Sequence, residues 1–460
     1  MNSSPTTPTD PLPLVAYIVS SDLVKYSSLL PSNPRRSFHV HTLVKDLGLL
    51  SSTYSVTRRI QVVRPRVASY KDLEIYHSKQ YLDYLLGDSD DEEALPEDFG
   101  LEDDCPVFPG LGEYVKAVAG ATLTAANALK IADVAISWDG GRHHAQKARA
   151  SGFCYIADCV LAILLLKKYP PIPYQVGHEN AREAHPTNPP PRKARVMYLD
   201  LDVHFSDGVS QAFYKPTTIT ATGSTPNSGR QVLTLSIHHT APGFFPSSNL
   251  SGLPPPLSEI IDSSSRSFDP YTLSIPLRRG LSSKTYHNIW PIVERVKDAF
   301  DPDYIVVQCG VDGLAGDPGS STSTESAGVG NWSLGGRSGQ DAVEEGSLGW
   351  CIERIMKTWR GKKLLLGGGG YHSPNAARAW AYLTSIALDN PLPLDTSIPV
   401  SHDAFPLYAP SFTLDVPPGN MEDRNWDPSS SSLSDAKERY DWVCRILEMD
   451  RLQTSVDLRF

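Results

Sequence analysis

The sequence predicts an open α/β fold in which a parallel sheet is flanked by helices. Five short apolar runs are each followed by glycine or turn residues and by reactive side chains. Runs of this length suit parallel strands that are buried on both faces. Segments of helical character separate the runs, and this alternation is typical of α/β proteins. The predicted strands are Asp133–Ile136, Val196–Leu199, Val232–Leu235, Tyr304–Val307 and Lys363–Leu366.

The segments between these strands have the composition of helices. In open sheets of this kind, ligands bind outside the carboxyl ends of the strands, where the reactive side chains of this sequence lie. The sequence therefore places the functional site at that edge of the sheet. The predicted helices are Tyr114–Ile131, Ala157–Lys168, Ser283–Ala299, Ala376–Leu388 and, near the C-terminus, Ser431–Leu447.

A chain of 460 residues has room for two or three average domains or for one large α/β domain with long loops. We expect one domain over residues 13–425, preceded by a disordered N-terminus (1–12) and followed by a C-terminal extension with a helix (426–460). Three stretches rich in Pro, Ser, Gly or acidic residues are predicted to be surface loop insertions without a catalytic part. They span about residues 170–195, 247–267 and 320–346.

Composition narrows the class of protein. The chain is 40% hydrophobic and 20% charged, as globular proteins are, and it has no apolar run long enough for a membrane helix and no signal pattern. Its six scattered cysteines disfavour a disulfide framework or a thiolate zinc site and suggest a reducing compartment. The net charge is −10, and ten of the seventeen residues from Asp88 to Asp104 are acidic. This segment is either a solvated loop or the source of an electrostatic field that attracts a basic partner. Its negative charge disfavours direct binding to nucleic acid.

Two predicted strands end in residues that could bind a metal ion. Alternate residues of a strand point the same way, so Asp200, Asp202 and His204 share a face. Alone, this pattern also fits a hydrogen-bonded strand end. Asp312 ends another predicted strand and supplies a third ligand beside Asp202 and His204. Three protein ligands leave an open position, as a catalytic zinc requires, although ferrous iron suits the same set.

Groups suited to proton transfer and to carbonyl polarisation follow other strands. His143 and His144 follow a Gly-Gly turn, and paired histidines near a metal can accept and deliver protons. Asp200 and Asp207 are the expected partners of their far nitrogens. Four glycines precede Tyr371, whose phenol could donate a hydrogen bond to a carbonyl oxygen that gains negative charge. The loop lacks the Lys-Ser/Thr of a phosphate-binding P-loop.

Two aromatic residues in loops beside these clusters, Phe153 and Phe245, each lie close to a glycine. Two aromatic faces could enclose a four-carbon alkyl stem in a narrow apolar tunnel. Either residue taken singly could equally be part of the core.

From about Val15 to Asn425 the sequence resembles the class I histone deacetylases. Within that class it is most similar to the histone deacetylase 8 subgroup, because Pro374 stands where other members have an arginine that binds inositol phosphate. The order and spacing of the motifs match outside the insertions. The motifs are Asp104-Cys105-Pro106, residues 137–145 (SWDGGRHHA), 150–155 (ASGFCY), 200–204 (DLDVH), 308–312 (QCGVD), 316–318 (GDP) and 367–371 (GGGGY).

The resemblance implies an arginase/deacetylase fold with an eight-stranded parallel sheet, and a deacetylase catalytic domain over residues 13–425. It implies hydrolysis of the N6-acetyl amide of acetyl-lysine in histones and other proteins by a zinc-bound water, in the nucleus or also in the cytoplasm. Corepressor proteins would be further partners. The implied roles are zinc binding by Asp202, His204 and Asp312; acid–base catalysis by His143 and His144; carbonyl polarisation by Tyr371; a lysine tunnel of Gly152, Phe153 and Phe245; substrate backbone binding by Asp104; acetate exit past Arg36; and a structural potassium site near Asp200, Asp202, His204, Ser236 and Ile237.

Some positions depart from the pattern of that family. Phe205-Ser206 replaces the usual His-Gly after the ligand histidine, Ala157 replaces a common Asn, and Arg149 replaces an acidic residue. None is a predicted ligand, so these changes bear on rate and substrate preference rather than on metal binding. Two other functions fit the sequence: an amidohydrolase of acetylated polyamines, and a chromatin scaffold with weak catalysis.

Overall fold

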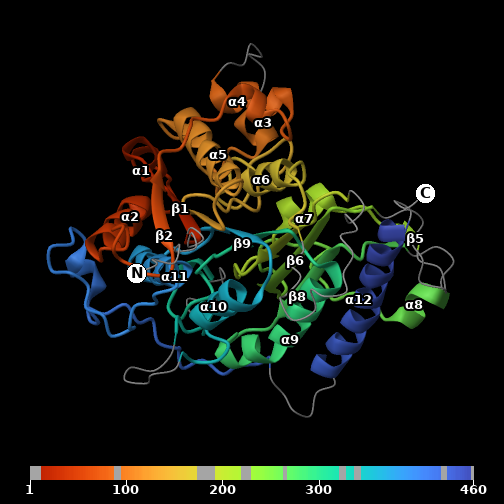
Figure 1. Cartoon of the computed structure of the whole chain (residues 1–460). Helices are drawn as coiled ribbons and strands as arrows, with labels where there is room; N and C mark the ends of the chain where they lie inside the picture. The colour runs from red at the N-terminus through yellow and green to blue at the C-terminus, as the bar shows by residue number, and fades with distance from the viewer. Residues whose placement is uncertain are drawn as a thin grey trace, which may run out of the picture.

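The computed structural model contains one large parallel sheet with helices on both faces (Figure 1). It describes residues 12–87, 95–173, 192–218, 229–262, 267–320, 328–335, 343–425 and 432–456. The predicted N-terminal tail at 1–12 lies almost wholly outside these residues, as do parts of the predicted insertions. Within the described residues the strands are β1 (Leu14–Ile18), β2 (Arg59–Val63), β3 (Val134–Ser137), β4 (Val196–Asp200), β5 (Thr217–Thr218), β6 (Val232–His239), β7 (Ser267–Phe268), β8 (Thr272–Leu277), β9 (Tyr304–Gln308) and β10 (Lys362–Leu366).

Eight of these strands form the main sheet, in the order β2-β1-β3-β10-β9-β4-β6-β8, and every pairing between them is parallel. β5 and β7 form a separate antiparallel pair. The prediction of an α/β fold with an eight-stranded parallel sheet is confirmed. Because β3, β10, β9 and β4 are neighbours at the centre of the sheet, the loops that follow them meet at one edge.

The helices cover both faces of this sheet, and no helix among the described residues is long and apolar enough to cross a membrane (Figure 1). They are α1 (Ser21–Ser27), α2 (Arg36–Asp46), α3 (Tyr70–Leu73), α4 (Lys79–Leu86), α5 (Leu111–Ala128), α6 (Asp158–Leu166), α7 (Asp207–Phe213), α8 (Leu257–Asp262), α9 (Ser283–Phe300), α10 (Leu348–Thr358), α11 (Ser373–Ala387) and α12 (Ser432–Val456).

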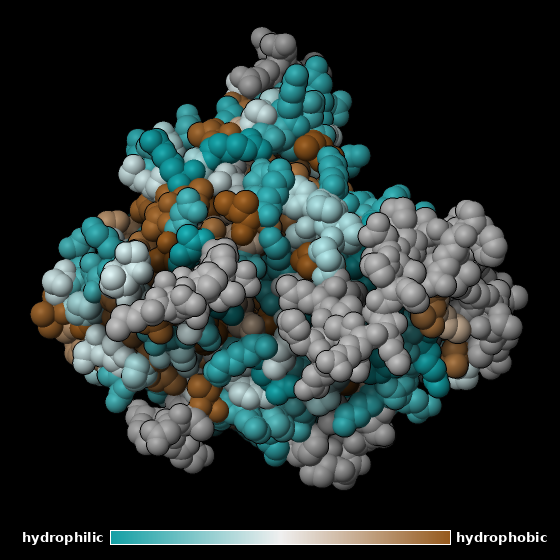
Figure 2. Space-filling model, viewed as in Figure 1, coloured by the Kyte–Doolittle hydropathy of each residue, from teal (hydrophilic) through white to brown (hydrophobic). Residues whose placement is uncertain are grey.

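The sheet separates two hydrophobic cores. Tyr17 of β1 faces the core that contains α2 and α9 to α12, whereas Ala16 and Ile18 face the core that contains α4, α5 and α6. In β4, Leu199 faces the first of these cores and Tyr198 faces the second. Successive side chains of a strand point to opposite faces, so a sheet covered on both sides needs strands that are apolar throughout. In the coloured part of the surface in Figure 2, hydrophilic side chains are widespread, with smaller hydrophobic patches between them.

Two of the predicted loop insertions contain ordered structure. The described part of the second includes α8, and Val329, Trp332 and Leu334 of the third lie in the core. Trp332 is completely buried and stacks on Tyr286, with ring centroids 3.7 Å apart. The prediction of a surface loop therefore does not hold for this part. Spaced tryptophan and leucine residues within a Ser- and Gly-rich stretch were the signal in the sequence.

Candidate metal centre and active-site cavity

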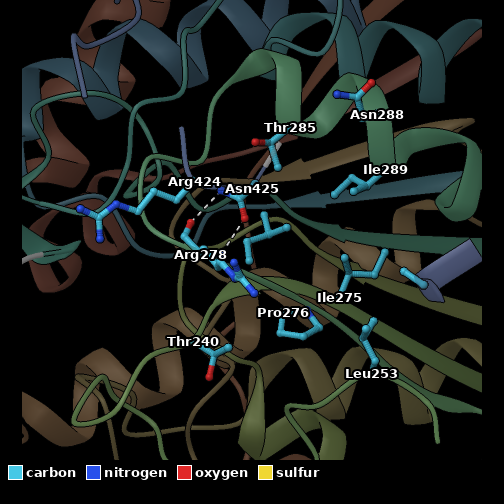
Figure 3. A pocket seen from close by; sticks show the side chains of 12 residues that line it. Thr240, Leu253, Ile275, Pro276, Arg278, Thr285, Asn288, Ile289, Arg424 and Asn425 are labelled. Atoms are coloured by element: carbon cyan, nitrogen blue, oxygen red, sulfur yellow. Dashed lines mark hydrogen bonds between the residues drawn. The ribbon is translucent and has the colours of Figure 1, made fainter. Parts of the chain in front are cut away.

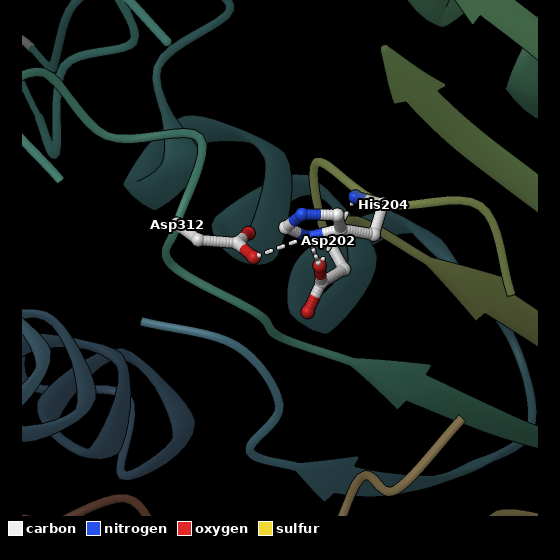
Figure 4. Close-up of side chains that lie close together, drawn as sticks. All are labelled: Asp202, His204 and Asp312. Carbon is white, nitrogen blue, oxygen red and sulfur yellow. Dashed lines mark hydrogen bonds and ion pairs between the residues drawn. The ribbon is translucent and has the colours of Figure 1, made fainter. Parts of the chain in front are cut away.

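Three side chains that could hold a metal ion converge beyond the carboxyl ends of β4 and β9 (Figure 4). Asp202, His204 and Asp312 are all buried, and each offers a ligand atom within 4.8 Å of the other two. His204 Nδ1 lies 3.2 Å from Asp202 Oδ1 and 2.9 Å from Asp312 Oδ2. The sequence placed these residues at two strand ends, and the adjacency of β4 and β9 brings them together.

Neighbouring groups fix the two carboxylates. Gln308 Nε2 and Gly369 N–H donate to Asp202 Oδ2 at 2.8 and 2.7 Å, and Val203 N–H donates to Asp312 Oδ1 at 2.9 Å. A Cβ on Gly369 would lie 2.2 Å from Asp312 Oδ2, so a side chain at this position would displace the ligand. Hydrogen bonds of this kind orient ligands before an ion binds.

The electrostatics of this cluster favour a cation. Burial lowers the pKa of His204, but hydrogen bonds to Asp202 and Asp312 outweigh burial and raise that pKa to about 10. Burial and the adjacent Asp202 carboxylate raise the pKa of Asp312 to about 7. Two buried carboxylates that share one site need positive charge beside them. Two carboxylates and one imidazole are borderline-to-hard donors that fit zinc, so the residues present fit the metal implied by the sequence.

The two adjacent histidines each bind a different carboxylate. His143 Nδ1 lies 2.8 Å from Asp200 Oδ2, and His144 Nδ1 lies 2.7 Å from Asp207 Oδ1. The imidazole centroids are 3.9 Å apart, and both side chains are buried. The structure thus brings together the four residues that the sequence proposed as partners.

The surroundings of the two histidines differ. Burial lowers the pKa of His143, but Asp200 and Asp202 more than compensate and raise it to about 9. Burial and the charge of His143 lower the pKa of His144 to about 4. One imidazole therefore favours a proton and its neighbour does not, which suits groups that take different parts in proton transfer.

Asp158, which was not predicted as a site residue, supports the turn that carries this histidine pair. Its carboxylate accepts hydrogen bonds from Gly141 N–H (3.0 Å), Arg142 N–H (2.7 Å) and the Thr122 hydroxyl (2.6 Å). The side chain is fully buried. An acidic residue directly before the apolar run of α6 was the signal in the sequence, because a buried carboxylate must have specific partners.

A cavity of about 370 Å³ opens above the metal cluster. Phe153 and Phe245 form aromatic walls; the ring of Phe245 packs 4.9 Å from that of His144, and the ring of Phe153 packs 5.5 Å from that of Tyr371. Asp104 accepts a hydrogen bond from Gly152 N–H at 2.9 Å. The lining residues are Asp104, His144, Gly152, Phe153, His204, Gly243, Phe244, Phe245, Gly319 and Tyr371.

Three of these lining residues had not been predicted: Gly243, Phe244 and Gly319. Phe244 stacks on His204 with ring centroids 5.1 Å apart, so it packs against a candidate metal ligand. Gly319 lies against the ring of Tyr371. The Phe244-Phe245 pair and the Gly316-Asp317-Pro318 motif stood in the sequence, but nothing in their spacing assigned these positions to the cavity.

The remaining predicted residues lie beside the cavity without lining it. Arg36 is buried and donates from Nη1 to the Gly370 carbonyl at 2.7 Å, and burial, with the nearby Arg142, lowers its pKa to about 10. Ser236 pairs in register with Asp200 between β4 and β6 and is followed by Ile237, and both are buried. The predicted potassium residues therefore lie on the adjacent strands β4 and β6 and in the loop that follows β4.

The replacements Phe205 and Ser206 lie next to these strands. Phe205 packs against His238 with ring centroids 4.8 Å apart, and Ser206 N–H donates to Ser236 Oγ at 3.4 Å. Both side chains are buried. They fill the interior beside the metal cluster and do not line the cavity.

A second cavity, of about 310 Å³, lies between β8, α9 and α12 (Figure 3). Apolar residues such as Ile275 and Ile289 form its wall, and Arg278 and Arg424 lie beside it. Its described lining residues include none of the predicted site residues and no His, Cys, Asp or Glu. Of these two cavities, the one above Asp202, His204 and Asp312 contains the candidate catalytic groups.

An α/β sheet with a buried Asp-His-Asp cluster, two carboxylate-bound histidines and a phenol around one cavity defines a metal-dependent hydrolase. A sequence model of the histone deacetylase domain matches residues 30–387. The chain belongs to the histone deacetylase family, a family of zinc-dependent amide hydrolases. The prediction of this family from the sequence is confirmed.

Three relatives illustrate the similarity. The chain is 34% identical to histone deacetylase 8 of Xenopus tropicalis, over 90% of this chain and 93% of the relative. It is 33% identical to histone deacetylase 8 of Danio rerio, over 89% and 90% of the two chains. It is 32% identical to probable histone deacetylase 1-A of Xenopus laevis, over 89% of this chain and 72% of the relative.

Proposed function

We propose that this protein hydrolyses the N6-acetyl amide of acetyl-lysine in histones and other proteins, with zinc as its metal. The observation that carries the proposal is the convergence of Asp202, His204 and Asp312 beneath a cavity that His144 and Tyr371 also line. A metal ligand (His204), a proton-transfer group and a hydrogen-bond donor thus border the same space. This arrangement is what amide hydrolysis requires.

Each chemical step has a candidate group. Zinc held by the two aspartates and the histidine would polarise the acetyl carbonyl and lower the pKa of water. One histidine of the His143–His144 pair accepts a proton from the attacking water. The Tyr371 phenol donates a hydrogen bond to the carbonyl oxygen as that oxygen becomes negative. An imidazole of the pair then protonates the lysine nitrogen as the C–N bond breaks, which leaves acetate and the free amine. Asp200 and Asp207 hold the histidine tautomers.

The cavity walls suit an acylated lysine stem. Gly152, Phe153 and Phe245 would enclose its methylene groups, and Asp104 at the rim would bind the peptide backbone of the substrate. A Cβ on Gly152 would lie 2.4 Å from His144 Cδ2, so only glycine leaves the cavity open there. We propose further that acetate leaves past Arg36 and that potassium binds near Asp200, Asp202, His204, Ser236 and Ile237.

Acetylated histone tails are the proposed partners, because basic tails complement an acidic chain of net charge −10. Corepressor proteins would bind as further partners, whereas no direct contact with nucleic acid or with a membrane is proposed. Histone substrates imply a nuclear location, and non-histone substrates would extend it to the cytoplasm.

The test is a deacetylation assay of purified protein, with acetyl-lysine peptides and acetylpolyamines as competing substrates. Tyr371→Phe should lower kcat about 10²–10³-fold while the protein keeps its zinc, because it removes one donor to the oxyanion. Full activity of this variant would exclude the proposed oxyanion role. Preference for acetylpolyamines would identify a small-molecule amidohydrolase, and a wild-type protein with full zinc and negligible turnover would identify a scaffold.

A further inference from the structure

A buried carboxylate joins the two loops that carry the chemistry. Asp317, which is 2% exposed, follows the candidate metal ligand Asp312 by five residues in the loop after β9. Its Oδ2 accepts hydrogen bonds from Tyr371 N–H at 2.8 Å and His372 N–H at 3.0 Å, in the loop after β10. The backbone of the predicted oxyanion donor is therefore bound to the loop of a metal ligand.

The other oxygen of this carboxylate shapes its own loop. Asp317 Oδ1 accepts a hydrogen bond from Gly319 N–H at 2.9 Å, which places Gly319 against the Tyr371 ring. A Cβ on Gly319 would lie 1.7 Å from Tyr371 Cδ2, so any other residue would displace the ring. Phe153 contacts the same ring from another direction, with centroids 5.5 Å apart in a T-shaped arrangement.

The burial of this carboxylate is costly. Burial raises the pKa of Asp317, and the three backbone N–H groups offset the effect in part. A buried carboxylate is retained where it makes specific hydrogen bonds, and the bonds to Gly319, Tyr371 and His372 restrain the surroundings of one phenol. A competing explanation is that Asp317 only stabilises the start of α11, since His372 is the N-cap residue of that helix.

We propose that Asp317 and Gly319 are positioning residues for Tyr371: the carboxylate fixes the backbone of the tyrosine, and the glycine leaves the space its ring needs. The inference rests on the proposed role of Tyr371 in acetyl-lysine hydrolysis. Small displacements of a catalytic group are costly because an oxyanion donor must lie within about 3 Å of the developing charge.

The test compares acetyl-lysine with trifluoroacetyl-lysine peptides on zinc-loaded full-length protein. Fluorine makes the carbonyl more electrophilic and its oxyanion less basic, so this substrate depends less on a hydrogen bond from the phenol. Asp317→Asn keeps the size of the side chain but replaces one of the two acceptor oxygens by a donor. The variant should lower kcat for acetyl-lysine about 10–100-fold and change KM less than about twofold. The decrease for trifluoroacetyl-lysine should be smaller.

Two further variants complete the design. Gly319→Ala displaces the ring without touching the carboxylate, and it should raise the trifluoroacetyl-to-acetyl ratio of kcat as Tyr371→Phe does. It keeps the proposal testable if Asp317→Asn fails to fold. Asp269→Asn is the matched control: Asp269 is fully buried and accepts hydrogen bonds from Lys215 N–H and Tyr271 N–H, but it lies outside the cavity. It should lower the Tm and leave the ratio unchanged.

The outcomes separate this inference from the proposed function. If Tyr371→Phe changes neither kcat nor the ratio, the role of the phenol itself is wrong. If Tyr371→Phe changes the ratio but neither Asp317→Asn nor Gly319→Ala does, Asp317 is only a cap of α11 and the positioning role is overturned. Loss of zinc from Asp317→Asn would also overturn it, because the carboxylate would then support the metal ligand loop instead.

Discussion

At the scale of single residues, the contact between Asp207 and His144 leads to a direct prediction. The carboxylate lies 2.7 Å from His144 Nδ1 in a buried pair, so it holds the proton on that nitrogen and leaves Nε2 without one. Asp207→Asn offers an amide in place of the carboxylate and disturbs this tautomer. We expect kcat on an acetyl-lysine peptide to fall about 10²–10⁴-fold, with the zinc content measured by elemental analysis unchanged.

The control for this prediction is the same substitution in a distant ion pair. Asp22 pairs with Arg64 at 3.1 Å on the surface, and Asp22→Asn should keep the kcat and the Tm of the wild type. A wild-type kcat for Asp207→Asn would show that the carboxylate does not set the tautomer.

A second residue-scale prediction concerns stability. Lys363 lies in β10, 8% exposed, and donates from Nζ to the Trp359 carbonyl. Burial, with a smaller effect of Arg58, lowers the pKa of this amine to about 8 from 10.5. Between these values the unfolded chain holds a proton that the folded chain has lost, so stability rises with pH across that window. Below about pH 8 both states are protonated and the full cost of burying the charge remains.

Lys363→Met should therefore be more stable than the wild type at pH 7, by up to about 3 kcal/mol, because one pKa unit corresponds to about 1.4 kcal/mol. The advantage should shrink as the pH approaches 10. Urea midpoints at pH 7 and 9.5 measure it, and the exposed Lys357→Met should show no such pH dependence. An advantage of equal size at both pH values would mean that packing, not charge, explains the effect.

Contacts between residues close in the sequence could be predicted, whereas contacts between distant loops could not. Asp202 and His204 could be predicted to lie together because they are only two residues apart, although β4 ends at Asp200 and both lie in the loop that follows it rather than in the strand. Asp158 and Asp317 act on backbone N–H groups of loops distant in sequence, and the course of a loop depends on the whole fold. An acidic residue is visible in a sequence, but neither its burial nor its hydrogen-bond partners are.

At the scale of elements, the central strands were predictable and the outer ones were not. β3, β4, β6, β9 and β10 are apolar runs because helices bury them on both faces. β2 reads Arg-Ile-Gln-Val-Val and lies at one edge of the sheet, mostly exposed. β8 lies at the other edge and contains Pro276, a residue that edge strands tolerate. β2 and β8 lack the continuous apolar pattern on which the prediction depended, whereas β1 (Leu-Val-Ala-Tyr-Ile) has this pattern, pairs on both sides and was still missed.

The last helix covers the edge strand β8 and leads to an element-scale prediction. Tyr440 of α12 donates from its hydroxyl to the Ser274 carbonyl of β8 at 2.7 Å, and Trp442, Val443 and Leu447 lie in the same core as α9. A chain that ends at residue 431 would expose this apolar surface and an unpaired strand edge. We expect it to aggregate or to lose cooperative thermal unfolding.

A point substitution in α12 tests its contact with β8 without removing the helix. Tyr440→Phe removes only the hydrogen bond to β8 and should cost about 1 kcal/mol, measured as a lower urea midpoint. Leu452→Ser, at a residue of the same helix that is 61% exposed, should leave the midpoint unchanged. If the chain that ends at residue 431 unfolds cooperatively with the Tm of the wild type, α12 is not part of the core that stabilises the domain.

At the scale of the whole molecule, the candidate active site and the first predicted insertion lie at opposite ends of the parallel sheet. The candidate site lies beyond the carboxyl ends of the strands, whereas the first predicted insertion joins the sheet at the opposite end. Asp303 directly precedes β9, is 1% exposed, and accepts hydrogen bonds from Ile172 N–H, Arg192 and Arg195 N–H. One carboxylate thus binds both described ends of this segment. The five residues of β9 place roughly 16 Å of strand between it and the loop that carries Asp312.

This separation predicts that the segment between these ends can be shortened without loss of activity. Replacement of residues 174–190 by a short Gly-Ser linker keeps Ile172, Arg192 and Asp303, so the start of β4 should remain in place. We expect kcat and KM on an acetyl-lysine peptide within about twofold of the wild type and a Tm change of a few degrees, because loop length has a small effect on closure entropy.

Asp303→Ala, in contrast, leaves the Arg192 guanidinium without this buried carboxylate and should lower the free energy of unfolding by about 3–5 kcal/mol. A shortened chain that folds with the wild-type Tm but has lost activity would show that the insertion takes part in catalysis, and that the two ends of the sheet are not independent.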